Sequence, residues 1–225
     1  MSAIARAPKV QHTPRLATST WAYFAAFARH PIRTWAQLLG DPARLRYGFF
    51  AVLTVALGYA ATVAGIAWSG GAPSPPWVAI PPAEYFKWEA LFVAPVTVLC
   101  WVLAGRVMYL LSMPFGGGGT YDDTLAFLGF AIALPTFVAL IPDAVRALLT
   151  SVGVVNRAAW EAAVNEPGTA DFLFLWAYMI AYVLALLCLF PMSVVWSQRL
   201  RSWPAIAVGV TGAVVYQGVY FIFIR

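Results

Sequence analysis

The chain has few charged residues. Of its 225 residues only 10% are Asp, Glu, Lys or Arg, whereas 62% are hydrophobic, and the mean hydropathy is +0.77. A water-soluble domain carries about 25% charged residues, so this chain lacks the charge to cover a folded surface in water. In lipid the backbone must satisfy its own hydrogen bonds, which leaves helices or closed barrels. The apolar runs are long and do not alternate with polar residues, so we predict an all-α integral membrane protein.

Cysteine and histidine are also scarce. The two cysteines, Cys100 and Cys188, both fall inside apolar runs, which excludes a disulfide framework. His12 and His30 lie 18 residues apart, and this spacing does not suggest a metal site. No serine–histidine–acid set and no paired carboxylates emerge from the sequence. We therefore expect no catalytic, cofactor-binding or metal-binding residues, and we predict that the protein is not an enzyme.

The positive charge is concentrated near the N-terminus. The formal net charge is +5, and seven of the fourteen Lys and Arg residues precede residue 48. A basic protein can bind nucleic acid, but cations placed ahead of the first apolar run are typical of a membrane topology signal. We therefore do not expect a nucleic-acid partner.

Five apolar runs are long enough to cross a hydrocarbon core of roughly 30 Å at about 1.5 Å per residue. They cover residues 48–68, 88–113, 124–142, 172–197 and 203–224. We assign residues 48–225 to one five-helix transmembrane domain.

The residues before the first run divide into two parts. Residues 1–18 are polar and basic and contain two prolines, which predicts a mobile tail. Residues 19–47 combine aromatic side chains with arginines, a pattern typical of amphipathic helices that lie in the membrane interface. The predicted interface anchors are Trp21, Phe24, Phe27, Arg29, Arg33 and Trp35. The alternative is that this segment packs on the bundle or on a partner.

The cations also predict an orientation. With the N-terminus inside, ten Lys and Arg residues lie on the cytoplasmic side and four on the opposite side. The ten are Arg6, Lys9, Arg15, Arg29, Arg33, Arg44, Arg46, Arg106, Arg199 and Arg201; the four are Lys87, Arg146, Arg157 and Arg225. Because cytoplasmic loops carry an excess of Lys and Arg, we predict that the N-terminus is inside and the C-terminus outside.

A run of glycines joins the second and third spans. Gly116, Gly117, Gly118 and Gly119 lack the lysine of a phosphate-binding loop and are interpreted as a tight reversal of the chain. Thr120 and Asp123 follow with the spacing of a capping box at the start of a helix. A second interpretation makes Tyr121, Asp122 and Asp123 a docking or ion-contact point.

Three prolines and one arginine lie inside the predicted spans. Pro95, Pro135 and Pro191 each remove a backbone hydrogen bond and permit a kink. Such kinks can line a path through the bundle or simply bend it. Arg106 lies seven residues before the end of the second run, from where a long side chain can reach the interface.

Small residues recur at four-residue spacing on three of the spans. This spacing lets helix backbones approach closely. The positions are Ala205, Gly209 and Ala213 on the fifth span, Ala61 and Gly65 on the first, and Gly129 and Ala133 on the third. Packing within the chain and packing against a second copy both use this pattern, so the two interpretations stay open.

Three stretches of the chain carry a resemblance to a known family: HPIRTWAQLLGDPARLRYGFF, FGGGGTYDDTLAFLGFAIALP and SQRLRSWPAIAVGV, at residues 30–50, 115–135 and 197–210. They resemble bacterial members of the Yip1 domain family. The resemblance covers roughly residues 30–225 and implies five spans with a cytoplasmic N-terminus. Eukaryotic members of the family are linked to small GTPases and vesicle traffic, and are not known as enzymes. The Asp-Leu-Tyr-Gly-Pro type of motif that they carry is missing here, so a GTPase partner is not implied.

These features predict a non-enzymatic protein of a bacterial inner membrane that acts by association. It would be a scaffold, a membrane-organising or assembly factor, or an accessory subunit of a larger membrane complex. Its partners would be the lipid bilayer and other membrane proteins or a second copy of itself. The rival hypothesis is a small transporter or channel, with a path lined by Pro95, Arg106, Pro135 and Pro191. Dry small-residue contacts favour the first hypothesis, and polar groups converging on a midplane cavity favour the second.

Overall fold

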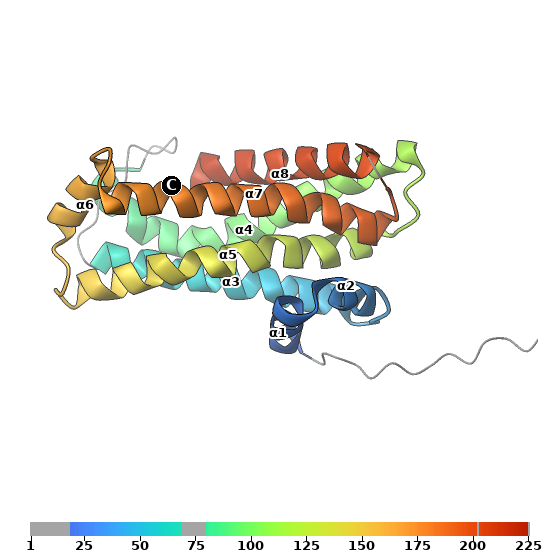
Figure 1. Ribbon diagram of the computed structural model, residues 1–225, viewed down its shortest axis with the longest axis horizontal. Coiled ribbons are helices and arrows are strands. Elements are labelled where there is room, and N and C mark those ends of the chain that lie inside the picture. Colours follow the sequence, from blue (N-terminus) through green and yellow to red (C-terminus); the bar gives the residue numbers. More distant parts are fainter. Residues whose placement is uncertain (1–18, 69–79, 202, 225) are drawn as a thin grey trace, which may run out of the picture.

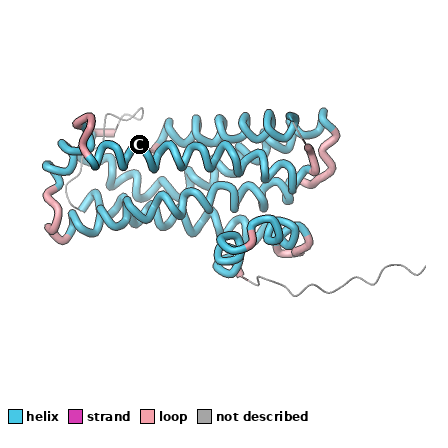
Figure 2. Tube along the Cα trace, in the orientation of Figure 1, coloured by secondary structure: helices cyan, strands magenta, loops and turns pink. Residues whose placement is uncertain are grey.

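The computed structural model describes residues 19–68, 80–201 and 203–224, and within these ranges the chain is helical without a strand (Figures 1 and 2). The tail predicted over residues 1–18 lies outside the described residues. The elements are α1 (Thr20–Arg29), α2 (Pro31–Leu39), α3 (Arg44–Trp68), α4 (Pro82–Ser112), the 3-10 helix η1 (Met113–Phe115), α5 (Tyr121–Ser151), α6 (Arg157–Asn165), α7 (Ala170–Gln198) and α8 (Trp203–Phe223).

Five of these helices, α3, α4, α5, α7 and α8, are long and apolar enough to cross a membrane. The predicted all-α architecture with five spanning helices is therefore confirmed. The third helix continues beyond its predicted end, because α5 runs through Pro142 to Ser151. Proline is tolerated inside a membrane helix where neighbouring groups satisfy the freed carbonyl, and the residues after Pro142 remain mostly apolar.

Helix α5 lies at the centre of the bundle. Its buried residues form an unbroken run from Asp123 to Ala133, whereas α7 is largely exposed on its outer side. Helices α3 and α7 pack along α5, while α4 packs against α3 and α8 (Figure 1). One end of the bundle holds the α4–α5 and α7–α8 turns and the start of α3. We call this end the glycine-turn end and the opposite one, where α6 lies, the α6 end.

A close helix crossing joins α3 to α5 through two glycines. A Cβ atom added to Gly129 would lie 2.5 Å from the carbonyl oxygen of Gly48, and one added to Gly48 would lie 2.6 Å from that of Ala126. A second crossing joins α8 to α7, where a Cβ on Gly209 would lie 2.4 Å from the backbone nitrogen of Pro191. Only glycine allows such backbone contact, and it gives close packing without a hydrophobic driving force between helices.

The predicted small-residue positions are therefore used mainly inside the chain. Ala205, Gly209, Ala213, Gly129 and Ala133 are buried, Gly65 lies opposite Ala147, and Ala61 is exposed. For α8 this favours packing within the chain over packing against a second copy, because its small-residue face is already covered by α4 and α7.

Helices α1 and α2 form a short hairpin that docks on the side of the bundle near the glycine-turn end (Figure 1). Trp35 is 1% exposed, stacks on Phe127 of α5 at 5.3 Å and meets Phe27 edge-on at 4.6 Å. Two of the predicted lipid anchors, Phe27 and Trp35, are therefore buried in protein, and Trp21 and Phe24 also contact rings of α5. The rings of Phe27 and Trp35 pack on Phe130 and Phe127 of α5, and aromatic pairs at such distances stabilise a contact beyond the apolar area that they bury. Trp21, Arg29 and Arg33 remain exposed, and Phe24 is half-buried.

Candidate functional site

The turn between α4 and α5 is held against the end of α7. Gly116 adopts a positive φ of 79°, a conformation that favours glycine. A Cβ atom on Gly119 would lie 1.7 Å from the carbonyl oxygen of Ser197, so no other residue fits there. The Gly118 N–H donates to the carbonyl oxygen of Gln198 at 3.0 Å. The glycine run therefore reverses the chain and also packs the α4–α5 turn closely against the end of α7.

Helix α5 begins with a reciprocal capping box. The Thr120 hydroxyl accepts from the Asp123 N–H at 3.1 Å, and the Asp123 carboxylate accepts from the Thr120 N–H at 2.9 Å. These bonds satisfy two backbone donors at the helix start, and the carboxylate also lies at the positive end of the helix dipole. Asp122, in contrast, is exposed to the outside.

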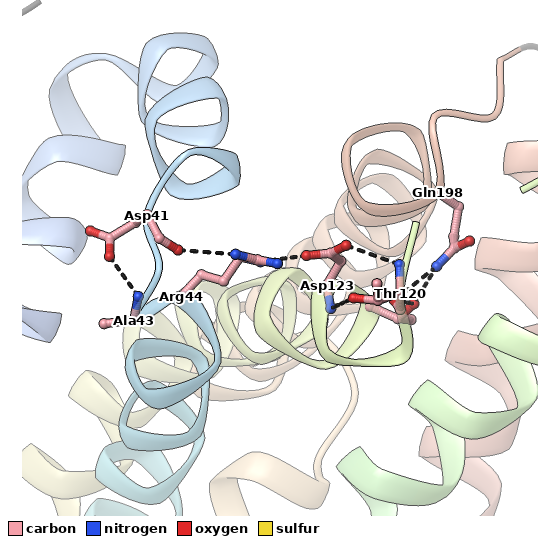
Figure 3. Close-up of polar contacts among 7 residues, drawn as sticks. Asp41, Ala43, Arg44, Thr120, Asp123 and Gln198 are labelled. Carbon is pink, nitrogen blue, oxygen red and sulfur yellow. Dashed lines mark hydrogen bonds and ion pairs between the residues drawn. The ribbon is translucent and has the colours of Figure 1, made fainter. Parts of the chain in front are cut away.

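Asp123 also forms an ion pair with Arg44 at the start of α3. The Arg44 guanidinium donates to Asp123 and, at 3.3 Å, to the carbonyl oxygen of Asp41 (Figure 3). Asp41 in turn accepts from the Tyr23 hydroxyl of α1 at 2.9 Å and from the Ala43 N–H at 2.8 Å. One carboxylate therefore caps α5 and joins it to α3, and a second joins α1 to the turn before α3.

Gln198 completes this arrangement from the end of α7. Its side chain is buried and donates to the carbonyl oxygen of Thr120 at 3.2 Å and to the Thr124 hydroxyl at 2.7 Å (Figure 3). We call the connected set Tyr23, Asp41, Arg44, Thr120, Asp123 and Gln198 the junction network. It joins α1, α3, α5 and α7 at the glycine-turn end. A site in which the polar groups bond to one another is suited to holding these four helices in one arrangement.

Sequence reasoning identified part of the junction network. Thr120 and Asp123 form the predicted capping box, and the four glycines lie in the turn that was predicted from them. The predictions missed Arg44, Gln198 and Tyr23, because their partners lie 79, 78 and 18 residues away. The local signal that was available is the Asp41-Pro42 turn followed by Arg44.

The residues predicted to line a path do not share a common space. Pro95 and Arg106 are exposed on the outside of α4, whereas Pro135 is buried and Pro191 packs on Gly209. The Arg106 guanidinium lies over the rings of Tyr109 and Tyr121, at 6.0 and 5.7 Å from their centroids. Tyrosine rings beside an arginine at the end of a span are typical of the membrane interface. Within the described part of the chain no group of His, Cys, Asp and Glu could hold a metal ion.

Replacing Asp123 with alanine is expected to lower the free energy of unfolding by about 2 kcal/mol, because it removes a helix cap and leaves Arg44 without its carboxylate. The measurement is unfolding of the purified protein in mild micelles by a denaturing detergent, followed by tryptophan fluorescence. Asp122→Ala is the matched control, since Asp122 is exposed in the same helical turn. Equal transition midpoints for the two variants would contradict the role given to the junction network.

Comparison with known proteins gives one match. The family model of the Yip1 domain matches residues 24–224, which include α2 to α8 and most of α1. No curated protein and no solved structure matches the chain. The matched region includes the glycine turn, the capping box and all five spanning helices, and the chain therefore belongs to the Yip1 domain family.

Proposed function

We propose that the protein is a non-enzymatic scaffold or accessory subunit of a bacterial inner membrane, that it acts by association, and that its N-terminus and glycine-turn end face the cytoplasm. The distribution of cations supports this orientation. Among the described residues, those at or near the glycine-turn end are Arg29, Arg33, Arg44, Arg46, Arg106, Arg199 and Arg201. Those nearer the α6 end are Lys87, Arg146 and Arg157.

The docked α1–α2 hairpin is the observation that carries the proposal. Its inner face is buried on α5, and Tyr23 joins it to the junction network. Its exposed residues include Ile32, 68% exposed, Arg29, Arg33 and Trp21, which is 59% exposed although its ring meets that of Phe137 of α5 at 6.2 Å. A rigid surface that combines exposed apolar side chains with arginines suits a protein partner, since aromatic residues and arginine are enriched in interfaces.

The packing at the glycine-turn half of the bundle favours association over transport. Backbone packs directly on backbone at the helix crossings there, and buried apolar residues such as Met108, Leu128 and Phe190 lie between α4, α5 and α7. A carrier needs polar groups along its path. The rival hypothesis of a transporter therefore has less support than association.

The test is the mass and composition of the tagged full chain after gentle extraction from native membranes. We expect a particle in which the 24.4 kDa chain is joined by a stoichiometric second protein or by further copies of itself. Arg33→Glu should reduce recovery of the partner several-fold, because it reverses a charge on the exposed face of α2. Lys87→Glu, a charge reversal at the α6 end, is the control and should leave the partner bound.

A particle with the mass of one chain and with no bound protein would contradict the association hypothesis. Solute flux measured in liposomes would then become the decisive experiment for the rival.

A further inference from the structure

Helix α1 lies beside the middle of α5 and not beside its end. The ring of Trp21 meets that of Phe137 at 6.2 Å, and the ring of Phe24 meets those of Phe137 at 5.6 Å and Phe130 at 5.9 Å. Both α5 residues lie more than two turns beyond the helix start at Tyr121. In Figure 1 the hairpin covers this side of the bundle only in the half nearer the glycine-turn end.

The packing of α3 on α5 gives the depth of these contacts in the membrane. Helix α3 carries no charged residue after Arg46 and reaches Trp68, about 33 Å farther on at about 1.5 Å per residue. This length matches a hydrocarbon core of roughly 30 Å, so the core begins close to Gly48. Gly48 packs on Ala126 of α5, and Phe137 lies eleven residues, about 16 Å, beyond Ala126. The end of α1 that contacts Phe137 is therefore near the middle of the core.

The side of α1 turned away from α5 carries no charge at this depth. The exposed residues of α1 before Arg29 are Trp21, Ala25 and Ala28, which recur at helical spacing on one side. The Tyr23 hydroxyl, on the inner side, is bonded to Asp41 and needs no water. An uncharged helix face at the hydrocarbon level is suited to contact with acyl chains.

Helix α2 lies closer to the membrane surface. Its Trp35 stacks on Phe127, one residue beyond Ala126 and hence at the edge of the hydrocarbon core. Arg29 and Arg33 are exposed where α1 meets α2, and long side chains can reach the headgroups from that level. The hairpin is thus apolar on its deeper outer face and basic near the surface, the pattern of helices inserted into one leaflet.

The opposite leaflet has no matching element within the described part of the chain. Helix α6 lies at the end of the bundle and not along its side (Figure 1). The Arg157 guanidinium of α6 donates to the carbonyl oxygen of Ile66 at 3.0 Å, two residues before α3 ends. Helix α6 is therefore level with the membrane surface. The bundle is wider in the leaflet at the glycine-turn end because only that leaflet holds the hairpin.

We propose that the α1–α2 hairpin is a wedge in one leaflet, that acyl chains cover the outer face of α1, and that the protein consequently prefers membrane that is convex on the glycine-turn side. A helix added to one leaflet expands that leaflet alone, and insertion of amphipathic helices depends on curvature. The inference goes beyond the association hypothesis and does not rest on it. Helix α1 meets lipid, whereas Arg33 of α2 lies at the headgroup level, where a protein partner can reach it.

The first test measures the depth of α1 in phosphatidylcholine liposomes. A nitroxide label is attached to Ala25→Cys in the full chain, with Cys100 and Cys188 replaced by alanine, and its contact with oxygen and with a water-soluble nickel complex is measured. We expect contact with oxygen alone, as for a label on Val138→Cys, a position 65% exposed on the middle of α5. A label on Asp122→Cys, exposed at the glycine-turn end, should contact nickel.

Two results at position 25 would overturn the proposal. Contact with nickel would place the outer face of α1 in water. Contact with neither reagent would show that protein covers this face, either a second copy or another part of the chain.

The second test measures the preference for curvature. Tubes are pulled from giant phosphatidylcholine vesicles that hold the purified full chain with a fluorescent label, and its density in the tube is compared with that in the flat membrane. With the glycine-turn end outward we expect several-fold enrichment in the tube, and with this end inward we expect depletion. Ala25→Leu keeps the apolar face and should keep the enrichment, whereas Ala25→Glu places a charge there and should abolish it.

Equal density in tube and flat membrane, or enrichment in either orientation, would contradict the wedge. Enrichment that persists in Ala25→Glu would assign the preference to the five spanning helices. Hydrogen exchange of α5 shows whether this variant stays folded; if it does not, the label depth and the enrichment of the unmodified chain decide. No other protein is present in these vesicles, so failure here leaves the association hypothesis standing, and absence of a partner in native membranes leaves the wedge standing.

Discussion

Replacing Gly129 with leucine is expected to prevent α3 and α5 from packing. Even a single Cβ atom at this position would lie 2.5 Å from the carbonyl oxygen of Gly48, and the nearest atoms belong to the backbone and cannot rotate away. Overpacking of a filled interior costs about 1–3 kcal/mol and occasionally more. Because a leucine here would press on backbone atoms, we expect a cost at the upper end of this range. The free energy of unfolding should fall by about 3 kcal/mol or more, and little protein should fold.

The measurement is the yield of monodisperse protein in mild detergent together with its thermal unfolding midpoint. Gly218→Leu is the control, because Gly218 is exposed on α8 and no atom lies within 4 Å of an added Cβ. Gly129→Ala should give an intermediate result. If Gly129→Leu and Gly218→Leu unfold at the same temperature, the close crossing of α3 and α5 is wrong.

Replacing Trp35 with alanine is expected to undock the α1–α2 hairpin while the five spanning helices stay folded. Trp35 is 1% exposed between Phe27 and Phe127, and truncation of a buried aromatic side chain costs about 3–5 kcal/mol. The hairpin is two short helices whose stability depends on tertiary contacts. We therefore expect the remaining contacts of the hairpin to be too weak to keep it docked on the bundle.

Hydrogen exchange measures this effect segment by segment. In the Trp35→Ala variant the amides of residues 20–39 should lose their protection, and those of α5 should keep it. Trp21→Ala is the matched control, since this tryptophan is 59% exposed. Unchanged protection of residues 20–39 in Trp35→Ala would show that the hairpin is held by something other than its aromatic face. The same variant would also test whether the association hypothesis depends on this surface.

Local patterns predicted the spanning helices and the cap of α5. In lipid the backbone of an uncharged run of about twenty residues satisfies its hydrogen bonds mainly by forming a helix. The capping box could be predicted because its two residues, Thr120 and Asp123, lie only three positions apart. The end of α5 was less well predicted, since a proline weakens a helical pattern by removing one hydrogen bond but does not by itself end a membrane helix.

The amphipathic segment illustrates the limit of such patterns. The aromatic residues of α1 and α2 indicate an apolar face, but lipid and protein both satisfy an apolar face. Only the bundle decided between them, because Phe127 and Phe130 of α5 offer rings at stacking distance to Trp35 and Phe27.

The sequence by itself determined the class of this protein: an all-α membrane bundle of five spans, with few groups for chemistry, that belongs to the Yip1 domain family. These properties depend on composition and local spacing, which each segment carries alone. The tertiary structure decided that the α8 seam packs inside the chain, that Arg44 meets Asp123, and that Gln198 of α7 donates to Thr124 of α5. Such contacts join residues far apart in the chain, and their partners become known only once the helices have packed.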